Sequence, residues 1–82
     1  MGYFSEIDLH GLTAAQARSK LDDTMKTLPD DVRELTVIHG YHQGTALLNL
    51  VRSYKHPRLE RKMLGLNQGS TIFLIRKNRT KP

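Results

Sequence analysis

Two successive strand patterns, each followed by a helix pattern, limit the folds open to this chain more than any other feature. Residues 3–10 alternate apolar with polar side chains and place Ile7 and Leu9 on one face, which predicts a strand with one covered face. Apolar residues at helical spacing predict a helix over residues 14–28, and the capping-box sequence that starts at Thr13 marks its beginning. The first unit is therefore a strand followed by a helix.

The second unit has the same order. Residues 34–39 are rich in β-branched side chains and predict a strand, and an apolar stripe predicts a helix from about residue 45 to about residue 55, before Pro57. A short strand is expected near residues 61–64. Residues 71–76 form a continuous apolar run, which predicts a central strand covered on both faces or nearly so.

This order of elements predicts an α/β fold, a two-layer sandwich in which two helices cover one face of a small mixed sheet. Strands joined through a helix run parallel with right-handed crossovers, so the first two strands should be neighbours. With 82 residues the chain has room for one core. We expect a single domain over residues 1–76 and a basic tail over residues 77–82.

Composition narrows the class of protein. The chain has no Cys, which excludes disulfides, thiolate zinc sites and a cysteine nucleophile, and fits a reducing cytoplasm. No apolar run approaches the roughly 20 residues of a membrane-spanning helix. No basic start precedes an apolar stretch, so we expect no secretory signal. The expectation is a monomeric cytoplasmic protein without membrane contact.

The charge of the chain is divided unevenly along its length. Residues 1–51 carry four Lys or Arg against seven Asp or Glu, a net charge of −3. Residues 52–82 carry nine Lys or Arg against Glu60 alone, a net charge of +8. Such a block attracts polyanions and gains affinity by releasing their counterions, which favours nucleic acid as a partner. A basic surface that only promotes solubility is the alternative.

Polar residues with catalytic potential end both predicted parallel strands. Asp8 and His10 close the first strand, and His39 closes the second. Because ligands gather at the carboxyl ends of parallel strands, we expect these three side chains to converge. Histidine titrates near neutrality, so a pair can supply a proton acceptor and a donor, and a carboxylate can orient an imidazole. The alternative is that all three residues only cap loops.

The loop after the second strand, from Gly40 to Thr45, suits an anion. Glycines let a backbone approach a ligand closely, and free N–H groups at a helix start bind phosphate. Tyr41 and His42 could stack on a base or simply shield the loop. The pattern of a strand, two glycines (Gly40 and Gly44) and a helix is common in βα loops, so it is a weak signal by itself.

Metal binding is expected to be loose if it occurs. A dedicated zinc site is not expected, since the histidines lack a nearby second carboxylate. Mg²⁺ or Mn²⁺ recruited through Asp8 and a substrate phosphate remains open. No other cofactor is indicated.

Three short motifs resemble those of the small MutS-related (Smr) domain family. Residues 7–13, IDLHGLT, are similar to the family's opening LDLHG motif. Residues 38–44, IHGYHQG, resemble its second motif, HGxGxG, with His42 at the place of the middle glycine. Residues 69–74, GSTIFL, resemble its closing G-x-T strand. The resemblance covers roughly residues 6–76.

The resemblance implies an α/β sandwich related in shape to the C-terminal domain of translation initiation factor three. It also implies nucleic-acid binding, often with nicking or endonuclease activity on DNA or RNA. The family's acid and first histidine correspond to Asp8 and His10, and its second histidine corresponds to His39. The family glycines correspond to Gly11, Gly40 and Gly44.

Two functions from different classes follow. In the first, the chain is an endonuclease in which Asp8 orients His10 or holds a metal or water, and His10 and His39 share general-base and general-acid duties. In the second, the same surface binds nucleic acid without cutting it. A weaker alternative is a protein-interaction domain whose basic tail binds an acidic partner. Contacts with phosphate or strand are expected from Gly11, Gly40, Tyr41, His42, Gly44, Thr45, Arg52, Lys55, Arg58, Arg61, Lys62, Arg76 and Lys77.

Overall fold

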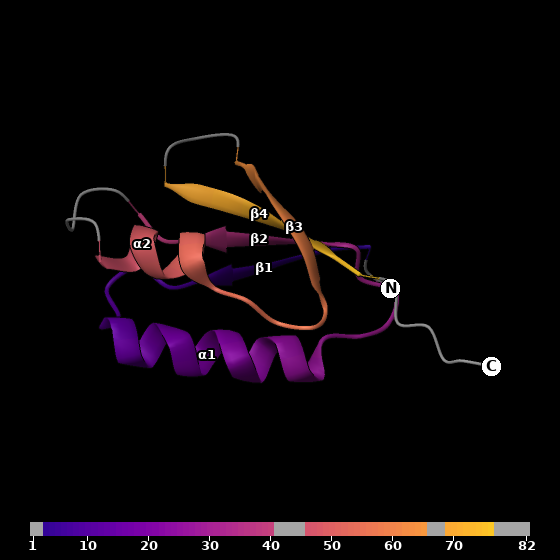
Figure 1. Cartoon of the computed structure of the whole chain (residues 1–82), viewed down its shortest axis with the longest axis horizontal. Coiled ribbons are helices and arrows are strands. Elements are labelled where there is room, and N and C mark those ends of the chain that lie inside the picture. The colour runs from indigo at the N-terminus through magenta and orange to yellow at the C-terminus, as the bar shows by residue number, and fades with distance from the viewer. Residues whose placement is uncertain (1–2, 41–45, 66–68, 77–82) are drawn as a thin grey trace.

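The structure, a computed structural model, describes residues 3–40, 46–65 and 69–76. These residues form four strands and two helices in the predicted order (Figure 1). The short strand expected near residues 61–64 is present and begins slightly earlier, at residue 59. Along the chain the elements are β1 (Phe4–Asp8), α1 (Ala14–Thr27), β2 (Glu34–Ile38), α2 (Ala46–Ser53), β3 (Leu59–Leu64) and β4 (Ser70–Ile75).

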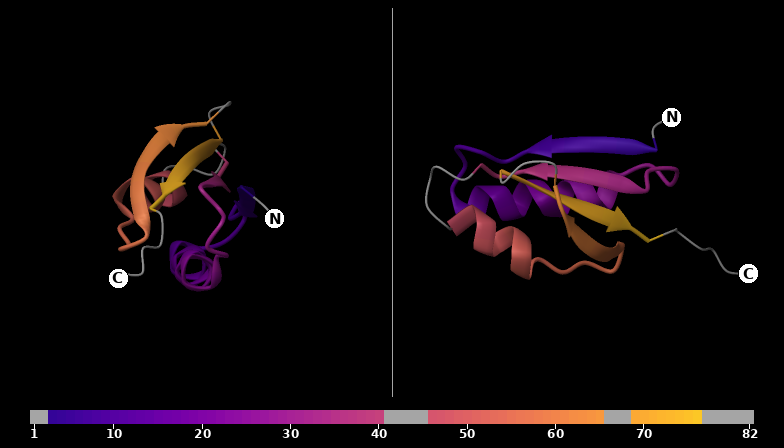
Figure 2. Two further views of the ribbon diagram at one scale, coloured as in Figure 1. Left: turned by 90° about the vertical axis from the view of Figure 1, so that its right-hand side faces the viewer. Right: turned by 90° about the horizontal axis from the view of Figure 1, so that it is seen from above.

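The strands form one mixed sheet in the order β1-β2-β4-β3. β1 and β2 run parallel with Asp8 beside Ile38, whereas β4 pairs antiparallel with both β2 and β3. The prediction that the first two strands are parallel neighbours is therefore confirmed. Figure 2 shows how α1 and α2 pack with this sheet to make the two layers of an α/β sandwich.

α1 begins where the capping-box sequence predicts. The Thr13 hydroxyl accepts a hydrogen bond from the Gln16 backbone N–H at 3.1 Å, and the Gln16 side chain accepts one from the Thr13 N–H at 3.0 Å. These two bonds satisfy donors that a helix start otherwise leaves unpaired. Beyond the cap, Ala17, Leu21 and Met25 recur at helical spacing and are buried against the sheet.

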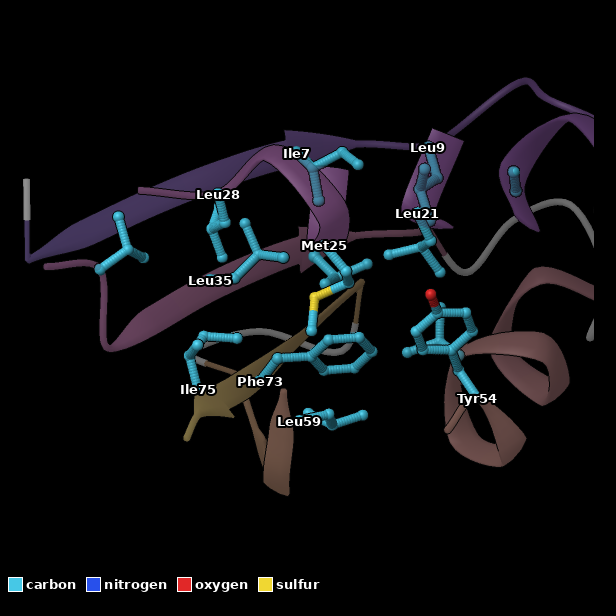
Figure 3. Close-up of a cluster of buried hydrophobic side chains, with 14 of the residues drawn as sticks. Ile7, Leu9, Leu21, Met25, Leu28, Leu35, Tyr54, Leu59, Phe73 and Ile75 are labelled. Atoms are coloured by element: carbon cyan, nitrogen blue, oxygen red, sulfur yellow. The ribbon is translucent and has the colours of Figure 1, made fainter. Parts of the chain in front are cut away.

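One hydrophobic cluster lies between the helices and the sheet. Its side chains come from both helices, from Tyr54 just after α2 and from all four strands. Figure 3 shows a close-up of this cluster. Phe73, on the central strand β4, is fully buried in the cluster. Burying a side chain of this kind stabilises a fold by about 1.5–3 kcal/mol relative to leaving it exposed. The Tyr54 hydroxyl also donates to Asp22 Oδ1 at 2.6 Å, and this bond ties the end of α2 to α1.

β4 is central in the sheet, as predicted, but it is not equally covered on its two faces. Thr71, Phe73 and Ile75 are buried, whereas Ile72 and Leu74 on the opposite face are half-buried. Phe73 and Ile75 belong to the core to which both helices contribute, whereas Ile72 and Leu74 lie outside it. The expectation that this strand is covered on both faces or nearly so is therefore met on the core face and only in part on the other.

Several predicted features lie outside the described residues. They are the loop residues Tyr41, His42, Gly44 and Thr45, and the tail that begins with Lys77. Within the described part of the chain, neither helix has the length and apolar character needed to cross a membrane.

Candidate functional site

The carboxyl ends of β1 and β2 meet at one edge of the sheet, as the sequence predicts. The Leu9 N–H donates to the Ile38 carbonyl at 2.7 Å, which extends the strand pairing past Asp8. A Cβ atom built on Gly40 would lie 3.6 Å from the Cβ of His10. The opening motif and the start of the glycine loop are therefore in direct contact.

His10 stands at the corner of a tight turn. The Leu12 N–H donates to the Leu9 carbonyl at 3.1 Å, so residues 9–12 form the turn. Gly11, its third residue, has a φ of 84°. A positive φ at the third position is the geometry of a type II turn and favours glycine. The turn sends the His10 side chain outward, next to the end of β1.

Asp8 and His10 form a hydrogen-bonded pair in this turn. The His10 Nδ1 lies 2.6 Å from Asp8 Oδ1, and the His10 backbone N–H donates to the same oxygen at 3.0 Å. The side chain of His10 is 64% exposed and that of Asp8 is 50% exposed. A carboxylate oxygen accepts, so Nδ1 carries the proton and Nε2 is the nitrogen left for exchange with a ligand.

The electrostatics of the pair keep Asp8 ionised at neutral pH. The side-chain hydrogen bond from His10 lowers the pKa of Asp8, and the backbone hydrogen bond and the nearby Lys20 charge act in the same direction. An ionised carboxylate on Nδ1 fixes the tautomer and the orientation of the imidazole. The pair can therefore take up and release a proton at Nε2.

Lys20 is a site residue that the sequence reasoning missed. Its Nζ donates to the Asp8 carbonyl at 3.2 Å from the middle of α1. The helical spacing could have indicated this contact. Lys20 is next to the buried Leu21, so it lies at the edge of the helix face that packs on the sheet. It places an ammonium group beside the carboxylate–imidazole pair.

His39 is placed differently from His10. It is only 2% exposed, and its Nδ1 lies 2.9 Å from the Gly40 carbonyl while its Nε2 lies 3.0 Å from Thr71 Oγ1. Because a carbonyl only accepts, Nδ1 donates, and in the neutral ring Nε2 accepts from the Thr71 hydroxyl. Both ring nitrogens are engaged inside the protein. That His39 shares acid and base duties with His10 stays a prediction, and in this structure its ring is not open to solvent as the ring of His10 is.

The buried end of β2 is also held by the start of β4. The backbone N–H groups of His39 and Gly40 both donate to the Gly69 carbonyl, at 2.8 and 2.9 Å. Gly40 has a φ of 75°, a conformation that favours glycine. The segment 69–71 therefore fixes the direction in which the chain leaves β2 towards α2.

The basic residues after residue 51 divide into engaged and exposed groups. Arg58 is engaged: one guanidinium nitrogen donates to the carbonyls of Met25 and Leu28, at 3.0 and 2.8 Å, and so caps the end of α1. Lys62 donates to the Arg52 carbonyl. These bonds give Arg58 a structural role, and its expected contact with a nucleic-acid strand stays a prediction.

Arg76 is also held, through a hydrogen bond of 3.1 Å from its Nε to the Pro57 carbonyl, although its side chain remains exposed. The side chains of Arg52, Lys55 and Arg61 are exposed as well. Within residues 3–40, 46–65 and 69–76, no group of three or more His, Asp or Glu side chains is arranged to hold a metal ion.

Together these features define a small two-layer α/β domain with an exposed carboxylate–imidazole pair at the ends of its parallel strands. The family model of the Smr domain matches residues 7–69, and the chain belongs to the Smr domain family. The family recognised from the sequence motifs is thereby confirmed. Family membership supports a function related to nucleic acid.

A solved structure is similar to the whole fold. It is the crystal structure of the Smr domain of Thermus thermophilus MutS2, with a TM-score of 0.77 and 25% sequence identity. The match covers 88% of this chain and 98% of that chain. Among curated proteins, no match to this chain was found.

Proposed function

We propose that this chain binds nucleic acid and hydrolyses a phosphodiester bond at the Asp8–His10 pair. The observation that carries the proposal is the pair itself: a carboxylate holds Nδ1 of an imidazole whose side chain is 64% exposed. An exposed imidazole whose Nδ1 is held by a carboxylate is arranged for proton transfer at Nε2. Membership of the Smr domain family adds support for a nucleic-acid substrate.

The proposed reaction uses one imidazole in both directions. As a water oxygen attacks phosphorus, Nε2 of His10 takes a proton from that water, and the ionised Asp8 stabilises the resulting imidazolium. The bond from phosphorus to the leaving oxygen breaks, and the imidazolium returns the proton to that oxygen. Atoms and charge balance over the cycle, and His39 is not needed as a second proton carrier.

Other groups near the pair would hold the substrate. Lys20 places an ammonium group beside Asp8, and Gly40 lies against His10 without a side chain that would block the approach of a phosphate. A divalent cation such as Mg²⁺ or Mn²⁺ would enter through the Asp8 carboxylate and the substrate phosphate. Exposed Arg52, Lys55 and Arg61 supply further positive charge.

A second candidate function is binding without cleavage. Two observations favour it: the buried His39 leaves His10 as the one open imidazole of the two strand-end histidines, and His42 occupies the place of a motif glycine. In this case protonated His10 and Lys20 would contact a phosphate without transferring a proton.

The two functions are separated by one assay. The parent chain is incubated with single-stranded RNA, duplex DNA and branched DNA, each with EDTA, with Mg²⁺ and with Mn²⁺. We expect cleavage of at least one substrate and a loss of roughly 10²–10⁴-fold in the Asp8→Asn variant. Asp23→Asn, an exposed carboxylate on α1, is the matched control and should cleave normally.

Two results would contradict the endonuclease proposal. The first is binding of these substrates by the parent chain with no cleavage under any of the conditions, which selects the binding module. The second is normal cleavage by Asp8→Asn, which leaves the endonuclease activity in place but contradicts the role given to the Asp8–His10 pair and makes Asp8 a structural residue. Binding is measured alongside by fluorescence anisotropy, so that loss of affinity is not mistaken for loss of chemistry.

A further inference from the structure

A second concave site lies away from the Asp8–His10 pair, between the segment after α2 and β3. Figure 1 shows the chain leaving α2 and turning back as β3. Side chains of these two segments line an open hollow of about 410 Å³. Pockets that bind small organic groups begin at about 300 Å³, so the volume is enough for one nucleotide unit. None of the residues of the Asp8–His10 site lines it.

The floor of the hollow is apolar and aromatic. Tyr54 and Leu59 line it and are themselves buried, so they form a fixed surface. The Tyr54 ring stacks with the ring of His56, with centroids 6.4 Å apart and planes 12° from parallel. On the core side Tyr54 also stacks with Phe73, at 6.0 Å and 10°. The stack ends in His56, whose ring lies at the hollow.

The orientation of His56 is fixed by the backbone. Its Nδ1 lies 3.1 Å from the Arg58 backbone nitrogen, whose N–H donates to it. Nδ1 therefore carries a lone pair, and the ring proton of the neutral imidazole is on Nε2. A ring held in this way offers a flat face and one N–H donor, which are the groups that bind a nucleobase.

The rim of the hollow is strongly positive. Lys55, Arg61 and Lys62 line it against the single acid Glu60. Lys62 lies over the Phe73 ring, with Nζ 5.9 Å from the centroid, and burial together with the Lys55 charge lowers its pKa. The ammonium groups repel one another at this rim, and an anion placed between them would remove that repulsion.

We propose that this hollow binds one nucleotide of a single strand, with its phosphate against Lys55 and Arg61 and its base on the ring of His56, which Tyr54 supports from behind. A single strand is favoured over a duplex, because only an unpaired base can leave its stack and enter a hollow. The proposal rests on the proposed function in that the chain must bind nucleic acid. The hollow would be a second contact, which would hold one nucleotide of the strand while another nucleotide of the same strand meets His10.

The first test compares three charge reversals on exposed positions. Lys55→Glu and Arg61→Glu lie at the hollow, and Lys26→Glu on α1 is the matched control. The probe is a labelled single-stranded oligouridine of roughly 12 nucleotides, measured by fluorescence anisotropy over a series of salt concentrations. We expect each hollow variant to lose about tenfold in affinity and to lower the salt slope by about 1, and the control to lose less than about twofold.

The second test separates the base from the phosphate. A strand with the same phosphates but abasic sugars should bind the parent about tenfold more weakly than oligouridine. In His56→Ala the preference for oligouridine over the abasic strand should largely disappear. Circular dichroism of each variant verifies that the fold is retained.

The outcomes distinguish this inference from the proposed function. If the parent chain binds oligouridine but Lys55→Glu and Arg61→Glu weaken it no more than Lys26→Glu, the second site is wrong while the Asp8–His10 site is untouched. If charge reversal weakens binding but the abasic strand binds equally well, the hollow holds phosphate alone and the nucleotide assignment is wrong. If the parent binds no nucleic acid, both the inference and the proposed function fail.

Discussion

The ends of β1 and β2 look alike in sequence, yet the structure gives them different surroundings. Each carries a histidine followed by a glycine with positive φ, at 84° for Gly11 and 75° for Gly40. His10, at the end of β1, has a side chain that is 64% exposed, whereas His39, at the end of β2, is 2% exposed. One histidine meets solvent and the other is part of the core.

Two features of the sheet explain the difference. The first is the alternation of side chains along a strand: His39 has the same parity as the buried Leu35 and Val37, whereas His10 alternates with the buried Leu9. The second is strand order. β1 is at the edge of the described sheet, whereas β2 lies between β1 and β4, whose Thr71 reaches His39. A histidine in a motif is therefore assigned a role only after its face and neighbours are known.

Removing the exposed histidine should have the largest effect. His10→Ala is expected to lower the cleavage rate by roughly 10²–10⁴-fold, because no other group can exchange a proton at that position. His10→Asn keeps a hydrogen-bond donor towards Asp8 but cannot transfer a proton, so it should be equally inactive. Single-turnover rates and binding affinities are measured together, and affinity should change little. Cleavage by His10→Asn at the parent rate would contradict the assigned role.

Removing the buried histidine should act on stability first. His39→Ala is expected to lower the free energy of unfolding by about 1–3 kcal/mol, because the Gly40 carbonyl and the Thr71 hydroxyl lose their partner. His39→Asn can still donate to the carbonyl and should recover part of the loss. Urea denaturation measures both.

The same two variants test whether His39 supports cleavage by holding the fold in place or by transferring a proton itself. Cleavage per folded molecule should fall less in His39→Ala than in His10→Ala, and His39→Asn should restore some of it. If His39→Ala is as stable as the parent and loses cleavage as severely as His10→Ala, the two strand ends act alike and the contrast drawn between them is wrong.

The smallest effect is expected in how the stability of the fold depends on pH through Asp8, at the exposed end of β1. The hydrogen bond from His10 lowers the pKa of Asp8 below its ordinary value of 3.8, so folding favours the ionised carboxylate. That contribution is fully present above the ordinary value and is lost as pH falls through the lowered one. Solvent screens a half-exposed pair, so the contribution is small.

A comparison of variants measures this contribution. The urea midpoints of the parent, Asp8→Asn and the control Asp23→Asn are followed from about pH 6 down to about pH 3. The parent and the control should lose stability more steeply at the acid end than Asp8→Asn does. Equal curves for all three would mean that the Asp8–His10 hydrogen bond does not distinguish the folded from the unfolded chain.

Much of the fold was predictable because its signals are local. The alternation before Asp8, the capping box at Thr13 and the β-branched run at residues 34–39 each depend on neighbours in sequence, and the structure has the expected elements there. The convergence of the two strand ends followed from the rule for parallel strands. The burial of His39 could also have been predicted from its parity with Val37.

The remaining differences depend on residues distant in sequence. Nothing around Arg58 indicates that its guanidinium reaches the last carbonyls of α1, because those carbonyls are separated from it by a strand and a helix. Charge alone assigned Arg58 and Lys62 to a ligand, whereas the structure uses their donors to satisfy backbone carbonyls. A basic residue near a helix end can either cap the last carbonyls of the helix or contact a phosphate of a ligand. Only the three-dimensional arrangement decides between these two roles.

The cap that Arg58 places on α1 also bears on how long the folded domain survives. Its guanidinium bonds to Leu28 and Met25, 30 and 33 residues earlier in the chain, so this contact requires the closure of a long loop. We expect a contact between residues this far apart in sequence to form late in folding, after the local elements have formed. Shortening this side chain should therefore accelerate unfolding and leave the rate of folding nearly unchanged. We therefore expect Arg58 to affect the lifetime of the native state more than the speed with which that state is reached.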